Sequence, residues 1–232
     1  MARPARTVKP RAKPKAAAKP ARVKPAPAKP APVKPAAAYP EQAFATPAAW
    51  SSWLAKHHAM SPGIAMRIGR KGGAPSVTYA EALEIALAWG WIDGQKAKGD
   101  DTAWIQRWSP RKPRSIWSKI NRDKALAMIE RGEMQPPGLA AIAQAKLTGQ
   151  WHAAYDSPKV AGVPADLAAA LAADPRAEAT FAGLDANNRY AILHRLQTAK
   201  LPATRARRLE TFVAMLGRGE TLHPPRRATG RR

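Results

Sequence analysis

The stretch TYAEALEIALAWGWIDG (residues 78–94) carries the strongest structural signals in the chain. Thr78, with Glu81 three residues later, has the pattern of a capping box, in which two side chains satisfy backbone N–H groups at a helix start. Leu83 and Leu87 then recur at helical spacing and predict a buried stripe. A glycine follows, which favours the end of a helix, and WID continues the chain in an extended form. The stretch therefore predicts a helix followed at once by a strand.

The segments on either side of this helix predict a small sheet. Residues 91–96 and 102–108 are expected strands around a Gly-Asp-Asp turn, as in a β-hairpin. Upstream, residues 64–68 alternate between apolar and other side chains, as a strand does. Thr46 followed by Pro47 marks another helix start, because threonine is a favoured N-cap and proline fits the first turn. These segments together predict a small α+β unit.

The rest of the chain predicts helices. A helix is expected to start near residue 120 with Ser118 or Asn121 as its N-cap, and Pro164, Pro175 and Pro202 separate alanine-rich helices further on. All eight tryptophans precede these last helices, so the aromatic core belongs to the first unit. We predict an α+β, mostly α fold: a small helix/strand/hairpin unit with a Trp-rich core, followed by a C-terminal helical domain. The expected parts are a basic Ala/Lys/Pro arm (1–43), the Trp-rich unit (44–160), a small helical domain (161–220) and a basic tail (221–232).

The charge of the chain is concentrated at its ends. The net charge is +23, and residues 1–40 contain 7 Lys, 4 Arg, 13 Ala and 10 Pro but no acid. Such a segment buries too little apolar surface to offset its ordering entropy, so disorder is expected. Its Lys-Pro repeats resemble the tails of linker histones. A nucleic acid or another polyanion is an expected partner, since each cation that pairs with a phosphate releases a counterion; the alternative is a solubilising linker.

Several classes of protein are excluded or disfavoured by composition. The chain has no cysteine, which excludes disulfides and thiolate metal sites. Its five histidines lack metal-ligand spacing, so we expect no metal and no cofactor. No run of 18 apolar residues occurs, so no membrane insertion is expected. The basic N-terminus is not followed by the apolar core of a signal peptide, and a cytoplasmic location is the expectation.

The stretch WSPRKPRSIWSKINR (residues 108–122) is the main candidate for a binding site. Pro110 and Pro113 hold the chain extended and keep the basic side chains between them off a helix face. Basic side chains beside a helix N-terminus are suited to an anion. The alternative is a structural turn in which the tryptophans only pack. The predicted anion- or nucleic-acid-binding residues are Arg111, Lys112, Arg114, Ser115, Trp117, Ser118 and Lys119, together with Arg205 and Arg208 of a second basic cluster.

No catalytic signature is present. SPRK (residues 109–112) has Ser-x-x-Lys spacing, but its two flanking prolines oppose the helix that this chemistry needs. The nucleophile-elbow and phosphate-loop patterns are absent. We predict no catalytic residues, although an enzyme of unrecognised type stays open. Its site would lie between the two body units, with Asp93, Arg111 and Trp117 as the first candidates.

Five segments in order resemble one bacterial family. YAEALEIALAWGWIDGQ, WSPRKPRSIWSKIN, GEMQPPGLAAIAQAKLTGQW, VPADLAAAL and TAKLPATRARRLE together are similar to the YdeI/OmpD-associated family, also named for bacteriocin protection, over roughly residues 44–219. The resemblance implies a small helical domain at residues 163–217. It also implies a role in resistance to cationic antimicrobial peptides, association with an outer-membrane porin and a periplasmic location, but no catalytic residues.

The sequence thus supports three hypotheses. The first is a non-enzymatic stress or bacteriocin-protection protein that binds an anionic ligand or partner through the basic Trp-flanked loop, with a polyanion-binding arm. The second is the unrecognised enzyme. The third is a DNA-binding, nucleoid-associated protein that acts through the arm alone.

Overall fold

The structure is a computed structural model that describes residues 39–224. Most of the predicted arm and the end of the predicted tail lie outside the described residues. The described part contains eight helices and a four-stranded sheet, which confirms the α+β, mostly α prediction. In chain order the elements are β1 (Glu41–Ala43), α1 (Pro47–His57), β2 (Ile64–Gly69), α2 (Tyr79–Ala88), β3 (Trp91–Ala97), β4 (Ala103–Pro110), α3 (Lys119–Glu130), α4 (Pro136–Leu147), α5 (Ala165–Ala172), α6 (Pro175–Ala182), α7 (Ala186–Gln197) and α8 (Pro202–Gly217).

The four strands form one sheet in the order β1-β2-β4-β3. β1 runs parallel to β2, while β4 pairs antiparallel with both β2 and β3. The predicted hairpin is therefore present, with a register shift between Asp93 and Lys96. Asp93 lies directly across from Trp108, so this acidic residue is fixed beside a core tryptophan near the end of β4.

β1 lies inside the segment that the sequence assigns to the arm. Its three residues, Glu41–Ala43, pair with Ala65 to Arg67 of β2, and the Ala65 N–H donates to the Pro40 carbonyl at 3.0 Å. Backbone hydrogen bonds to the sheet edge hold this strand, and they require no side-chain pattern. A three-residue strand is too short for a detectable period of two, which is why composition placed it in the arm.

The helix starts follow the predicted capping patterns. Thr46 accepts a hydrogen bond from the Ala49 N–H at the start of α1. At the start of α2, Thr78 and Glu81 form the complete capping box. Ser118, rather than Asn121, is the N-cap of α3, and its hydroxyl accepts from the Asn121 N–H at 3.1 Å. These contacts fix the point where the loop after β4 becomes a helix.

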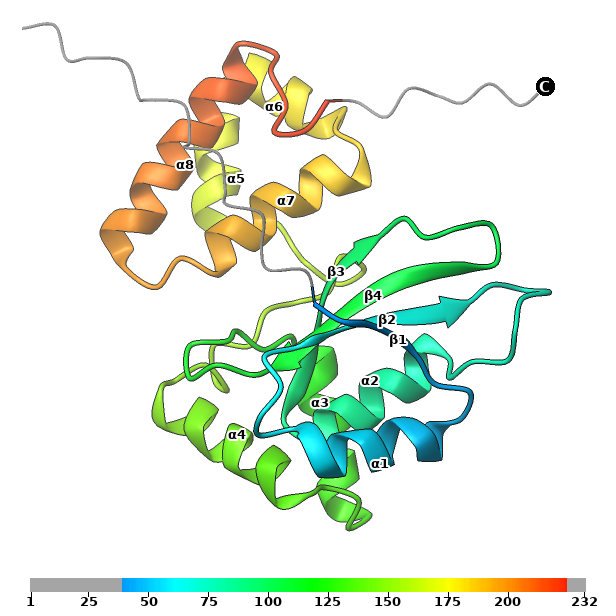
Figure 1. Ribbon diagram of the computed structural model, residues 1–232. Coiled ribbons are helices and arrows are strands. Elements are labelled where there is room, and N and C mark those ends of the chain that lie inside the picture. The colour runs from blue at the N-terminus through cyan, green and yellow to red at the C-terminus, as the bar shows by residue number, and fades with distance from the viewer. Residues whose placement is uncertain (1–38, 225–232) are drawn as a thin grey trace, which may run out of the picture. The chain divides into compact units, whose positions relative to one another are not determined.

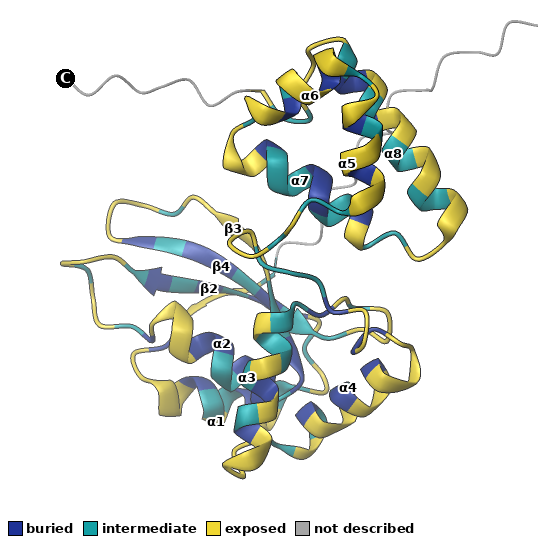
Figure 2. Cartoon of the chain, turned by 180° about the vertical axis from the view of Figure 1, so that it is seen from behind, coloured by how far each residue is buried: buried dark blue, intermediate teal, exposed yellow. Residues whose placement is uncertain are grey.

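A Trp-rich core joins the sheet to the first helices. Figure 1 shows α1, α2 and α3 on the same side of the sheet, and Figure 2 shows buried residues on the inner sides of α1 and α2. Trp50 is fully buried and its indole N–H donates to the Ala82 carbonyl at 3.1 Å. The Trp91 indole likewise donates to the His58 carbonyl at 3.2 Å. These bonds satisfy the polar end of each large ring. The other fully buried tryptophans are Trp108 and Trp117.

Helices α5 to α8 have a core of their own. It is built from leucine, isoleucine and phenylalanine side chains that include Leu167, Phe181, Ile192 and Leu216. The packing continues past residue 220, the predicted end of the domain, because Leu222 contacts this core. No helix within residues 39–224 has the length and apolar character needed to cross a membrane.

Candidate functional site

The predicted binding loop is a closed turn between β4 and α3. The Arg111 N–H donates to the Gly90 carbonyl at 2.9 Å, which ties the loop to the end of α2. The Lys112 N–H donates to the Ser115 hydroxyl at 2.9 Å, and the Ser115 N–H donates back to the Lys112 carbonyl at 2.8 Å. Thr148, just after α4, donates its hydroxyl to the Pro113 carbonyl. The loop is therefore anchored at both ends and at its tip.

The side chain of Arg111 is the most unusual group in this loop. The centre of its guanidinium lies 3.5 Å from the centroid of the Trp117 ring. One terminal nitrogen, Nη1, donates to the Ile116 carbonyl at 3.3 Å. The other two nitrogens, Nε and Nη2, are buried and have no hydrogen-bond partner among the described residues. Together these two atoms form one edge of the guanidinium, the Nε–Nη2 edge.

Burial dominates the electrostatics of this guanidinium. It lowers the pKa of Arg111 from 12.5 to about 10, while the negative charge of Asp93 acts in the opposite direction. Asp93 and Arg111 interact through their charges but form no ion pair within 4.0 Å. At neutral pH the side chain of Arg111 is still protonated. The loop thus holds a buried positive charge whose hydrogen bonds within the chain are incomplete.

A small cavity adjoins this group. Its volume is about 70 Å³, against about 460 Å³ for the tyrosine-lined pocket described below. One water needs roughly 10–15 Å³ and drug-sized pockets span about 300–1,000 Å³, so the small cavity suits a compact group. Four of the predicted residues line the cavity: Arg111, Lys112, Ser115 and Trp117. Pro113 of the same loop and three residues of α4, Ala141, Gln144 and Ala145, complete the lining.

Three other predicted residues from this stretch lie outside the cavity. Arg114 is exposed at the tip of the turn. Ser118 is used as the N-cap of α3. Lys119 forms an ion pair with Asp156 at 2.6 Å. Four of the seven predicted residues of this stretch therefore line the cavity, and the other three lie elsewhere.

The second predicted cluster makes contacts within the chain. Arg205 binds the carboxylate of Asp166 through Nε and Nη2 at 2.7 and 2.8 Å, and Nη1 donates to the Leu196 carbonyl. Arg208 donates to the Arg195 carbonyl. Both arginines were predicted to bind an anion or a nucleic acid, and the carboxylate that Arg205 binds in the structure belongs to Asp166 of the same chain.

A larger pocket lies beside the loop and has a volume of about 460 Å³. Tyr79 donates its hydroxyl to Asp93 Oδ2 at 2.9 Å on one wall. Burial, and secondly the charge of Asp93, raises the pKa of Tyr79. Burial likewise raises the pKa of Tyr155, and it raises that of Tyr190 to about 12. Neutral phenols and one carboxylate therefore line this pocket, and Ser118 reaches it as well.

Sequence reasoning missed the three tyrosines of this pocket. They come from the start of α2, from the segment after α4 and from α7, and are far apart in the chain. No local spacing links them. The one available signal was Asp93, which follows two apolar residues in a predicted strand, and it was named only as a candidate residue of an unrecognised enzyme.

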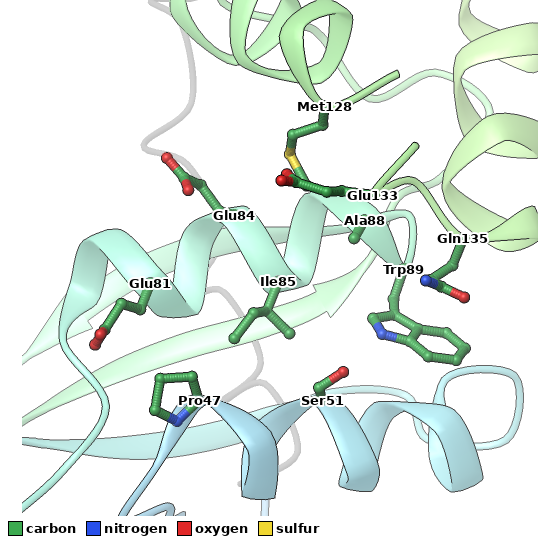
Figure 3. Close-up of a pocket in the computed structure, with 10 residues that line it drawn as sticks. All are labelled: Pro47, Ser51, Glu81, Glu84, Ile85, Ala88, Trp89, Met128, Glu133 and Gln135. Atoms are coloured by element: carbon green, nitrogen blue, oxygen red, sulfur yellow. The ribbon is translucent and has the colours of Figure 1, made fainter. Parts of the chain in front are cut away.

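A further pocket of about 410 Å³ lies between α1 and α2 and is drawn in Figure 3. Ile85 of α2 and Trp89, which follows α2, point into it, and three glutamates lie around it. Each carboxylate already has a partner: Glu81 belongs to the capping box, Glu84 pairs with Lys124, and Glu133 pairs with Arg131. These contacts within the chain account for the glutamates. Within residues 39–224, no group of three or more metal-ligating side chains is found.

Two family models match separate parts of the chain, one before and one after the predicted boundary at residue 160. Residues 42–141 match a model described as a domain of unknown function (DUF8412), and they span β1 to the middle of α4. Residues 160–219 match the model described as "Bacteriocin-protection, YdeI or OmpD-Associated" and span α5 to α8. No curated protein and no solved structure shows significant similarity to the chain. Residues 160–219 are therefore similar to the YdeI/OmpD-associated family, which confirms the family resemblance over that part of the chain.

Proposed function

We propose that this protein is a non-enzymatic bacteriocin-protection protein that binds an anionic ligand or partner through the loop at residues 110–118. The supporting observation is the buried Nε–Nη2 edge of Arg111. A buried charge is costly unless it is paired and hydrogen-bonded. An oxyanion would supply both a negative charge and two acceptors to this edge, and hydrogen bonds between charged groups are among the strongest in proteins.

The surroundings of Arg111 also favour an anion. Stacking on Trp117 holds the guanidinium plane in a fixed orientation, so less side-chain entropy is lost when a ligand binds. Lys112 lines the same cavity and adds a second positive charge. The domain of the family named for bacteriocin protection would then be linked to a ligand-binding unit in one chain.

The test is anion binding by the full chain and two arginine variants. Arg111→Gln removes the charge and keeps a side chain of similar polarity. Arg114→Gln is the matched control, because Arg114 lies in the same turn but is exposed. Calorimetric titration with acetate, phosphate and sulfate should show at least about a tenfold loss of affinity, or about 1.4 kcal/mol, for the first variant and little change for the second. Equal binding by a well-folded Arg111→Gln variant would reject this site.

We propose in addition that residues 1–40 bind polyanions, as their eleven cations and lack of acids suggest. The experiment compares duplex DNA binding by the full chain and by a chain that begins at Ala38, over a series of salt concentrations. This starting point retains the Pro40 carbonyl that accepts from Ala65. Affinity that falls steeply with salt and disappears with the arm would support nonspecific binding. If the shorter chain binds DNA and Arg111→Gln abolishes that binding, the loop is itself a nucleic-acid contact.

An enzyme is the second candidate function, supported by the hydrogen bond between Tyr79 and Asp93 in the 460 Å³ pocket. A carboxylate and a phenol in contact inside a pocket can exchange a proton with a bound molecule. Incubation with a mixture of small metabolites, followed by mass spectrometry, would detect turnover. Activity that is lost in Asp93→Asn and kept in Arg114→Gln would establish this candidate, whereas identical product profiles with and without the protein would count against it.

A further inference from the structure

Three arginines in the described part of the chain bind carboxylates in the same way. Each uses Nε and Nη2 as a pair, and the donor–acceptor distances lie between 2.7 and 2.9 Å. The two N–H groups of this edge are parallel and match the spacing of the two carboxylate oxygens. The pairs are Arg131 with Glu133, Arg205 with Asp166 and Arg218 with Glu220.

Arg111 presents the same edge without such a partner among the described residues. We infer that the loop binds a small monocarboxylate, held side-on by Nε and Nη2 of Arg111 where the turn opens next to the cavity that Arg111 and Trp117 line. This inference rests on the proposed anion-binding function and names the chemical class of the ligand.

The local charge favours a single negative charge on the ligand. Arg111 and Lys112 supply two positive charges, and Asp93 already supplies one negative charge that acts on Arg111. A ligand with one negative charge would bring the summed charge of Arg111, Lys112, Asp93 and the ligand to zero. A dianion such as sulfate would leave a net negative charge in this partly buried region, which is unfavourable.

The size and lining of the cavity favour a short ligand. Its volume of about 70 Å³ exceeds what one water needs but is far below that of a pocket for a nucleotide or a peptide. The lining of the cavity also includes the apolar groups of Trp117, Ala141 and Ala145. A carboxylate with one or two further carbon atoms would place its charged end at Arg111 and its carbon atoms against these apolar groups.

Access to the Nε–Nη2 edge requires the turn to move, because both nitrogens are shielded from solvent in this state. The residues of the turn at 112–114 are exposed. Two hydrogen bonds between Lys112 and Ser115 close the turn. These are local contacts that can open without disturbing the core. The ligand would enter between this turn and α4.

The experiment uses the full chain and follows the indole N–H signal of Trp117 by NMR during titration at neutral pH. The probes are acetate, propionate, benzoate and sulfate, with sodium chloride keeping the ionic strength constant. We expect acetate or propionate to bind at least about ten times more tightly than sulfate, a difference of about 1.4 kcal/mol. Benzoate should bind more weakly than acetate because its ring exceeds the cavity.

Three variants locate the site. Arg111→Lys keeps the charge but loses the paired donors, so it should weaken acetate binding about tenfold or more, a change of about 1.4 kcal/mol. Ala145→Val narrows the cavity without changing any charge and should weaken propionate more than acetate. Arg114→Lys makes the same chemical change at an exposed position and should leave both affinities unchanged.

The outcomes separate the inference from the proposed function. If sulfate binds at Arg111 and the carboxylates do not, the ligand class is wrong while anion binding stands. If no probe shifts the Trp117 signal, both fail. Carboxylate binding that persists in Arg111→Lys would place the ligand elsewhere and would also overturn the inference.

Discussion

Replacing Arg111 with methionine should leave the stability of the ligand-free protein nearly unchanged. The lowered pKa, from 12.5 to about 10, corresponds to a net cost of about 3 kcal/mol for keeping the charged form buried. Methionine removes this cost and retains an apolar stem of similar length on Trp117. It loses a cation–π contact of up to about 2 kcal/mol and one hydrogen bond, to Ile116, of about 1–1.5 kcal/mol. These terms nearly cancel.

The assay is urea unfolding of the full chain, monitored by tryptophan fluorescence. We expect Arg111→Met to change the free energy of unfolding by no more than about 1 kcal/mol, whereas removing one partner of a well-satisfied buried ion pair costs about 3–5 kcal/mol. Arg205→Met is the matched control, because Arg205 makes two hydrogen bonds to Asp166 and one to Leu196. That change should cost about 1–2 kcal/mol. A loss above about 3 kcal/mol for Arg111→Met would refute the reasoning, since it would mean that Arg111 is fully satisfied within the chain.

Three further predictions concern the fold around the site. Gly138→Ala should destabilise by about 1–3 kcal/mol in thermal unfolding, because the new methyl group would collide with the Ala88 carbonyl; Gly162→Ala, with open space around it, should be neutral. Thr78→Ala should cost about 1 kcal/mol through loss of the capping box, and an unchanged melting temperature would show that the cap contributes nothing. The pKa of Tyr190 is raised to about 12, so the folded state holds this proton more tightly and stability should fall as pH rises from about 10 to 12. Tyr190→Phe should reduce that fall, as followed by circular dichroism.

The parts of the fold that could be predicted depend on neighbours in the sequence. The capping box of Thr78, the N-cap of Thr46 and the hairpin strands all involve residues a few positions apart. Their hydrogen bonds form within one helix turn or across one hairpin, so the local sequence pattern is enough to predict the contact. These elements were therefore expected with correct types and close boundaries.

The parts that could not be predicted depend on contacts between distant residues. β1 is held by backbone hydrogen bonds to β2, which leave no trace in the side chains of a three-residue strand. Arg205 looked unpaired because Asp166 is 39 positions away. Tyr79 and Tyr155 approach Asp93 only after the sheet and helices have packed. Sequence spacing reports none of these distances.

The candidate site combines both kinds of information. The prolines at 110 and 113 indicated that the basic side chains between them would stay off a helix, and this much follows from backbone chemistry. Which of those side chains is buried depends on the position of Trp117, because it is the stacking on this ring that takes Arg111 inward while Arg114 stays exposed. The loop could thus be identified from the sequence, but the residue that matters most within it could not.

Leaving Nε and Nη2 of Arg111 unpaired costs folding free energy, and a carboxylate that binds these two atoms would offset that cost. A ligand that satisfies Nε and Nη2 stabilises the folded state by RT ln(1 + [L]/Kd), or about 2.7 kcal/mol when its concentration is about 100 times Kd. Arg111→Met removes the cost permanently and should also remove this ligand-dependent gain. The wild-type protein should therefore become the more stable of the two only when the carboxylate is present. A reversal in the order of stability on adding acetate is a consequence that neither a purely structural loop nor an anion site elsewhere in the chain would produce.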